Sequence, residues 1–181
     1  MNDNNWQQLL IANHPQLFIR SFRGLPFSPG YPLTPDGWRE IVTKVADRVS
    51  EAAAGHSVYF CQISERYGRL RIYWNAESAL PRRVERSIEE VIALAEARSS
   101  CSCATCGAEG RLFATGGLLL TACAAHARGE PVPTHPRLEN VHLSRRFVGA
   151  DIDSVECCRY DRRSDAFVEV DPGTLMVDEQ T

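Results

Sequence analysis

The chain has 181 residues, of which 44% are hydrophobic and 24% are charged, and its formal net charge is −3 at pH 7. This length and composition suit one soluble globular domain with its own core. The net negative charge argues against a protein that coats nucleic acid through overall positive charge, although a local basic patch is compatible with it.

The first third of the chain predicts two helices separated by an ordered loop. A short helix is expected over Trp6–Ala12, and the proline-rich stretch Gly24–Leu33 is expected to be the loop. Thr34 is a good N-cap and Pro35 suits a first helical position, so a longer helix should start there. Apolar residues at helical spacing continue it as far as Gly55.

A hairpin and another long helix are predicted next. The stretches Ser57–Ile63 and Arg69–Trp74 are rich in β-branched and aromatic residues and flank a turn at Glu65–Gly68. Apolar residues at helical spacing then predict a helix over Pro81–Arg98. The predicted fold class is therefore α+β, with a small antiparallel hairpin or sheet packed against two main helices in residues 1–100.

Four potential metal ligands follow in the pattern Cys103-x2-Cys106 and Cys123-x2-His126, with sixteen residues between the two pairs. Two intervening residues let each pair curl around one ion, and structural zinc prefers four thiolate or imidazole ligands in a tetrahedron. Three thiolates and one neutral imidazole leave no open position. The pattern therefore predicts one structural Zn²⁺ that activates no water.

The interval between the ligand pairs predicts a treble-clef or zinc-ribbon arrangement in residues 101–129, integral to the same domain. Arg111–Ala114 and Leu118–Thr121 should pair across a glycine turn, and Ala122–Ala127 should form a short helical turn. The alternative is that the thiols are small buried hydrophobic groups and the histidine is a surface residue. Cys101 is either a bystander or a substitute ligand.

Residues 130–181 should form a proline-rich linker, Glu130–Pro136, a second hairpin and a frayed acidic tail. The hairpin strands are expected at Ser154–Tyr160 and Ala166–Val170. The adjacent Cys157 and Cys158 should point to opposite faces of a strand, so they do not chelate one ion easily.

Arginines and a tyrosine near the first hairpin and the second long helix could contact an acidic protein or a nucleic-acid backbone. These residues are Arg66, Arg69, Arg71, Tyr73, Arg82 and Arg83. The alternative is an ordinary solvated surface, neutralised by nearby glutamates such as Glu65 and Glu85.

No catalytic set stands out in the sequence, which contains no nucleophile elbow and no phosphate-binding glycine loop. A zinc deaminase would need a glutamate two residues after an upstream ligand, and none follows His56 in that way. His135, Asn140 and His142 could serve a nuclease, or they could be exposed loop residues. The sequence therefore predicts a protein without enzymatic activity.

From about Gln16 to Ala127 the chain resembles a family of small uncharacterised proteins common in bacteriophages and prophages. The matching segments are Asp36-Gly37-Trp38, Gln62 to Tyr73, Ala93 to Ala97, Cys103 to Gly107 and Cys123 to His126. Ser64, Tyr67 and Arg69 replace the lysine, phenylalanine and second glycine of the family's turn. The resemblance implies a zinc-binding fold of mobile-element origin in a bacterial cell, and the family has no established activity that could be carried over to this chain.

Seven cysteines, several of them near one histidine, do not resemble a secreted disulfide framework. The polar start, Met1 to Asn5, lacks the pattern of a signal peptide, and no apolar run is long enough to cross a membrane. We therefore expect a cytoplasmic protein. The closed metal site and the missing catalytic set suit an interaction protein, and the resemblance to phage proteins implies one that binds a host, toxin or defence protein as an inhibitor or immunity-type protein. Nucleic-acid binding is the alternative, and a nuclease that uses His135 or His142 is a third, weaker hypothesis.

Overall fold

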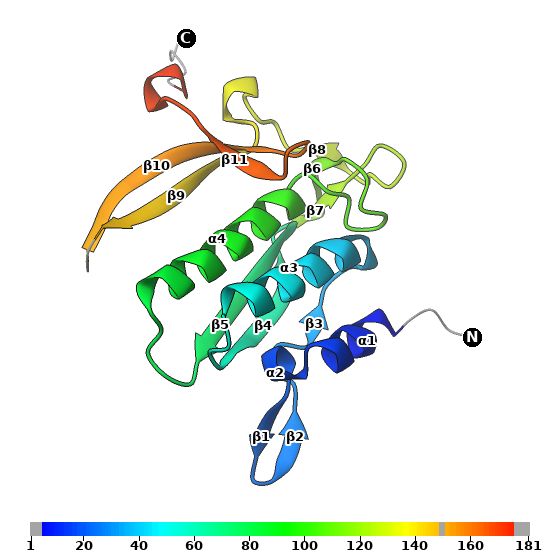
Figure 1. Ribbon diagram of the computed structural model, residues 1–181. Helices are drawn as coiled ribbons and strands as arrows, with labels where there is room; N and C mark the ends of the chain where they lie inside the picture. Colours follow the sequence, from blue (N-terminus) through cyan, green and yellow to red (C-terminus); the bar gives the residue numbers. More distant parts are fainter. Residues whose placement is uncertain (1–4, 149–150, 176–181) are drawn as a thin grey trace.

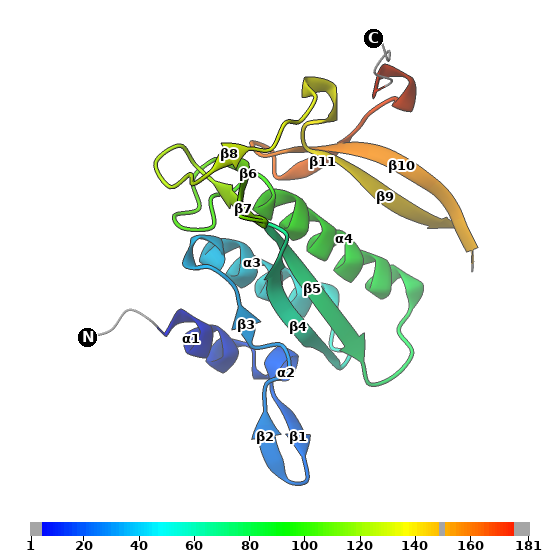
Figure 2. The same cartoon turned by 180° about the vertical axis from the view of Figure 1, so that it is seen from behind.

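A long hairpin covered by two helices forms the centre of the fold (Figures 1 and 2). The structure is a computed structural model that describes residues 5–148 and 151–175. Strands β4 (Val58–Arg66) and β5 (Arg69–Ala76) pair in antiparallel fashion, and helices α3 (Arg39–Ala52) and α4 (Arg82–Ser99) lie on one face of them. The predicted α+β class is confirmed, as are the hairpin and both main helices.

The core lies between this hairpin and the helices. Phe60 and Ile63 are both buried although they are three residues apart on β4, where strict alternation would place them on opposite faces. A register shift between Phe60 and Gln62 leaves Cys61 as an extra residue and returns Ile63 to the buried face. Valines and isoleucines of the two helices complete the core: Val42, Val45, Val49, Val84, Ile88 and Ile92.

The short helix predicted over Trp6–Ala12 is confirmed, but the segment that follows it differs from its prediction. Helices α1 (Trp6–Asn13) and α2 (Pro15–Phe18) are followed by a projecting hairpin of β1 (Arg20–Phe22) and β2 (Leu25–Phe27). Strand β3 (Pro32–Leu33) then pairs in parallel with β4. The expected loop Gly24–Leu33 is therefore wrong for Leu25–Phe27 and Pro32–Leu33, which are strands, and holds for the residues between them. Arg23 and Gly24 both adopt positive φ and form the two-residue turn of the hairpin. Its prolines fit because an edge strand tolerates them.

The start of the first long helix was also predicted wrongly. Residues Asp36–Trp38 form the 3₁₀ helix η1, and the α-helix begins only at Arg39. The Thr34 hydroxyl does not cap the helix; it is buried and has no hydrogen-bond partner among the described residues. Tertiary contacts override the local preference. The Asp36 carboxylate accepts a hydrogen bond from the indole of Trp6 (2.9 Å).

The C-terminal sheet has three strands instead of the two that were predicted. Its order is β11 (Ala166–Glu169), β10 (Asp151–Asp161) and β9 (Val141–Val148), and it lies alongside α4 (Figures 1 and 2). The expected linker contains β8 (Glu130–Pro131), and its last residue begins the 3₁₀ helix η2 (Pro136–Leu138).

Of the expected frayed tail, residues 172–175 form the 3₁₀ helix η3 (Pro172–Leu175), and residues 176–181 lie outside the described part of the chain. Within the described residues, no helix combines the length and the apolar character that crossing a bilayer requires.

The turn between β10 and β11 attaches this sheet to the helices through one carboxylate. Asp165 accepts hydrogen bonds from Lys44, from Arg48 (3.2 Å) and from the Tyr160 hydroxyl (2.7 Å), and Arg98 lies 3.5 Å away. Burial alone would raise the pKa of Asp165, but the hydrogen bonds from Lys44 and Tyr160 and the nearby positive charges outweigh it. They hold the pKa below its usual value.

We expect Asp165→Asn to destabilise the protein by about 2 kcal/mol at pH 7, because three cations lose their carboxylate while remaining partly screened by water. Because the pKa of Asp165 is lower in the folded state than its unfolded value of about 3.9, the carboxylate stabilises the fold at pH values above that unfolded pKa. This stabilisation is lost as the pH falls through the folded-state pKa. Urea unfolding of both proteins should therefore show a gap at pH 7 that shrinks near pH 3. Glu169→Gln, an exposed change on β11, is the control, and an equal gap at both pH values would contradict the assignment.

Candidate metal centre

Two turns bring the four ligands together. After α4, Cys103 and Cys106 sit in a tight turn closed by a hydrogen bond from the Gly107 amide to the Cys103 carbonyl (2.8 Å). Gly107 has φ +74, and a Cβ there would lie 2.8 Å from the carbonyl oxygen of Gly37, so glycine is required for two reasons. The second pair follows a hairpin, as predicted.

The hairpin consists of β6 (Arg111–Thr115) and β7 (Leu118–Ala122), and β8 pairs with the other edge of β6. Cys123 comes directly after β7. The amide of His126 donates a hydrogen bond to the Cys123 carbonyl (3.0 Å), which closes a single turn. The short helical turn expected at Ala122–Ala127 is therefore a turn without helix. A treble clef would need a helix there, so that alternative is not confirmed.

The spacing of the ligand atoms fits one tetrahedral ion. All four atoms lie within 4.8 Å of one another. The sulfurs of Cys106 and Cys123 are 3.8 Å apart, and Nδ1 of His126 lies 3.6 Å from the Cys103 sulfur and 3.3 Å from that of Cys123. Zinc bonds of about 2.3 Å to sulfur and about 2.0 Å to nitrogen imply tetrahedral edges of roughly 3.8 and 3.5 Å. The residues present therefore form one candidate metal site.

The electrostatics of the thiols differ across the site. Burial alone would raise the pKa of Cys103, but hydrogen bonds from the backbone amides of Cys123, Cys106 and Thr105 outweigh it and lower the pKa to about 6. The Ala108 amide lowers the pKa of Cys106, yet burial and the two neighbouring sulfurs leave it raised overall. Neighbouring thiolates repel one another, so the three thiols resist losing all of their protons. A bound dication would offset this repulsion.

The other cysteines lie outside this cluster. Cys101 is buried beside Ala97 and Tyr160, and burial raises its pKa. Cys158 is buried within β10, and Cys157 is half-buried. Among the residues that the structure describes, the four predicted ligands are the one group of three or more that could hold a metal ion.

The metal loop is joined to the rest of the core by buried hydrogen bonds. The indole of Trp38 donates to the Ser102 carbonyl (2.9 Å), and the Gly37 amide donates to the Ala104 carbonyl (2.9 Å). On the opposite side, the Thr121 hydroxyl donates to the Gly68 carbonyl in the β4–β5 turn (2.7 Å). A metal ion held here would therefore stabilise both the start of α3 and the turn of the central hairpin.

The structure divides the predicted partner-binding residues into two groups. Arg66 and Arg69 are exposed and face each other across the β4–β5 turn, next to Arg71 and Tyr73 along β5. The remaining two, Arg82 and Arg83, lie at the other end, because α4 runs antiparallel to β5.

Arg71 forms an ion pair with Glu96 (2.6 Å), and Tyr73 remains exposed. The same Glu96 carboxylate accepts the outward-facing amide of Ile72 (3.1 Å), and Ser99 accepts that of Leu70 (2.8 Å). Side chains of α4 thus protect this part of the edge of β5.

The two histidines of the nuclease hypothesis have other surroundings. Nδ1 of His135 accepts the Arg137 amide (3.2 Å) at the start of η2. The ring of His142 packs against Phe167, with 5.8 Å between centroids. Burial, together with the charges of Arg69 and Arg71, lowers the pKa of His142 to about 4.

Sequence reasoning missed an exposed apolar surface near the N-terminus. Large hydrophobic side chains on and beside the β1–β2 hairpin are open to solvent: Ile19, Phe22, Leu25, Phe27, Tyr31 and Leu33. The available signal was the number of aromatic and aliphatic residues between Phe18 and Leu33, which is more than an exposed loop needs. Comparisons with protein-family models, curated proteins and solved structures found no match to the chain.

Proposed function

We propose that the protein is a non-enzymatic protein–protein interaction module whose metal site holds one structural Zn²⁺. The observation that supports binding is the projecting β1–β2 hairpin (Figures 1 and 2). Phe22 is 63% exposed and Leu25 is 72% exposed, which is unusual for neighbouring large apolar residues in a soluble protein. Covering such residues with a partner gains about 25 cal/mol for each Å² of apolar surface.

The base of the hairpin is fixed, which limits the entropy lost on binding. The guanidinium of Arg20 lies 4.0 Å from the centre of the Tyr59 ring and forms an ion pair with Glu77. Phe18, just before the hairpin, packs against Phe60 in the core. The hairpin is thus presented by a rigid body, a preorganised arrangement that favours affinity.

An apolar projection of this kind suits insertion into an apolar groove of a host, toxin or defence protein. The proposed role is that of an inhibitor or immunity-type protein of mobile-element origin, which blocks its partner by occupying that groove. Four ligands in a closed tetrahedron support a structural rather than catalytic metal, since no position is left for water or substrate.

We expect Phe22→Ser with Leu25→Ser to weaken partner binding by at least 30-fold, because anchors at the centre of an interface contribute about 2 kcal/mol or more. Leu118→Ser is the matched control, since Leu118 is 76% exposed at the tip of a different hairpin. A protein retained by the wild type from bacterial extract is identified and purified, and its Kd is measured by calorimetry. Equal affinity of the hairpin double variant and the control would contradict the proposal.

Nucleic-acid binding remains the alternative, and the exposed pair Arg66 and Arg69 favours it. Contacts to phosphate make affinity fall steeply with salt, whereas an apolar interface is less sensitive. Binding to single-stranded DNA that weakens by orders of magnitude between 50 and 200 mM salt, and is lost in an Arg66→Ala, Arg69→Ala double variant, would favour this alternative.

A further inference from the structure

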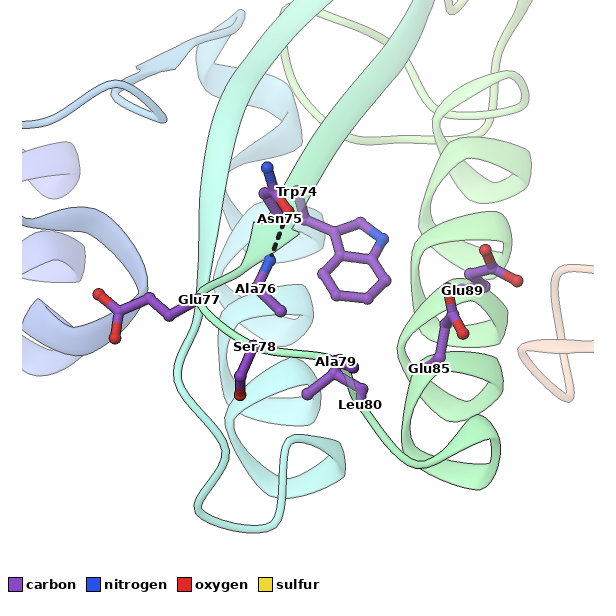
Figure 3. Close-up of a pocket in the computed structure, with 9 residues that line it drawn as sticks. All are labelled: Trp74, Asn75, Ala76, Glu77, Ser78, Ala79, Leu80, Glu85 and Glu89. Atoms are coloured by element: carbon purple, nitrogen blue, oxygen red, sulfur yellow. Dashed lines mark hydrogen bonds between the residues drawn. The ribbon is translucent and has the colours of Figure 1, made fainter.

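A cavity of about 590 Å³ lies between the end of β5, the loop that follows it and the first turns of α4 (Figure 3). The indole of Trp74 forms one wall and the side chains of Glu85 and Glu89 lie across from it on α4. Leu80 contributes an apolar floor. The cavity is at the opposite end of α4 from the metal site, so it is separate from the site described above.

The indole of Trp74 is available to a ligand. The other two tryptophans are satisfied inside the protein, since Trp6 donates to Asp36 and Trp38 donates to the Ser102 carbonyl. Across the described residues, the indole N–H of Trp74 has no hydrogen-bond partner, and the side chain is only half-buried. The face of this ring can therefore contact a bound cation, and its N–H can donate only to an acceptor elsewhere on the ligand, such as a peptide carbonyl.

The two glutamates place two negative charges on one side of the cavity. Glu85 and Glu89 are one helical turn apart on the same face of α4, an arrangement that destabilises a helix. Among residues 5–148 and 151–175, neither carboxylate forms an ion pair, whereas Glu77 at the rim points away from the indole and pairs with Arg20. Burial, and then the neighbouring charge of Glu85, raise the pKa of Glu89.

An aromatic face opposite two carboxylates suits an organic cation. A guanidinium group stacks on an indole and donates planar pairs of hydrogen bonds to carboxylates, which an ammonium group does not do. The volume is far larger than a metal ion needs, and an indole is no metal ligand. We propose that this cavity binds a guanidinium group, supplied by an arginine side chain of a peptide or by a small free guanidinium compound.

The test uses the three indole N–H signals of the full-length protein in a ¹H–¹⁵N NMR spectrum, with the Trp74 signal assigned by Trp74→Phe. The probes are N-acetyl-arginine amide, its neutral isostere N-acetyl-citrulline amide, and a five-residue peptide with one central arginine between glycines. We expect saturable shifts of the Trp74 signal with both arginine probes, while the signals of the buried Trp6 and Trp38 stay in place. If the peptide binds more tightly than N-acetyl-arginine amide, the guanidinium group is supplied by a peptide. If the two bind equally, it is supplied by a free compound.

Glu89→Gln should weaken binding of the arginine probes at least tenfold, and Glu90→Gln, an exposed neighbour outside the cavity, should change it less than twofold. Both positions are exposed, and circular dichroism confirms that each variant folds. The proposal is overturned if the citrulline probe binds as well as the arginine probe. It is also overturned if the Trp74 signal does not move, or if the two glutamine variants behave alike.

Discussion

One zinc ion per chain is expected in the purified protein, and Cys106→Ser is expected to abolish its binding. Cys106 supplies one of the four ligand atoms of the cluster, and its sulfur is 3.8 Å from that of Cys123. Three remaining ligands would leave an open position and lower the affinity sharply. Metal content is measured by inductively coupled plasma mass spectrometry on wild type and variant.

Loss of the ion should also lower stability, because apparent free energies on the order of 10 kcal/mol accompany zinc binding by small structural sites. Even part of this amount lowers Tm by more than about 10 °C in a chain of this size. Cys61→Ser is the control, since Cys61 lies on β4 outside the cluster. A metal-free wild type that unfolds cooperatively at the same temperature as Cys106→Ser would contradict the prediction.

Trp38→Ala should destabilise the protein by about 3–5 kcal/mol, the usual cost of removing a large buried aromatic side chain. Trp38 is 0% exposed within the main core, and its indole holds the Ser102 carbonyl next to the first metal ligand. The same variant should bind zinc more weakly, because the loop loses this contact. Urea unfolding and competition with a zinc chelator measure the two effects.

Trp38→Phe separates the two contributions of this side chain. Phenylalanine keeps most of the buried volume but cannot donate to the Ser102 carbonyl, so the loss should be only about 1–2 kcal/mol. If Trp38→Phe and Trp38→Ala lowered the free energy of unfolding equally, the packing of the aromatic ring would not be the source of the stability that Trp38 contributes. Unchanged zinc affinity in both variants would mean that the hydrogen bond does not position the loop.

The sequence was most informative where a signal was local. Helices α3 and α4 follow from apolar residues repeated every three to four positions, and the hairpin of β4 and β5 follows from β-branched and aromatic runs around a glycine turn. The candidate metal site was predicted for the same reason. Two residues between the ligands of each pair, and a hairpin between the pairs, place four side chains at one point.

Other features depend on contacts distant in sequence, which a pattern does not encode. Thr34 has the chemistry of an N-cap, but the contact between Trp6 and Asp36 sets the path of the chain there. The β1–β2 hairpin was not predicted because prolines usually argue against a strand, although an isolated edge strand tolerates them. The sequence of strand β9 has no alternation of apolar and polar residues strong enough to predict a strand. Its hydrogen-bonded pairing with β10 is what stabilises it as one.

The turn between β10 and β11 contacts parts of the chain that are synthesised long before it. Its Arg162 donates to the Gly107 carbonyl (3.0 Å) and its Asp165 binds cations of α3 and α4, and both residues follow the last metal ligand, His126. Chains tend to fold from the N-terminal side as they leave the ribosome. The four candidate ligands are therefore available to a metal ion before the C-terminal sheet exists. Zinc shortage during translation should then halt assembly before that sheet docks, whereas chelation afterwards acts on a finished protein.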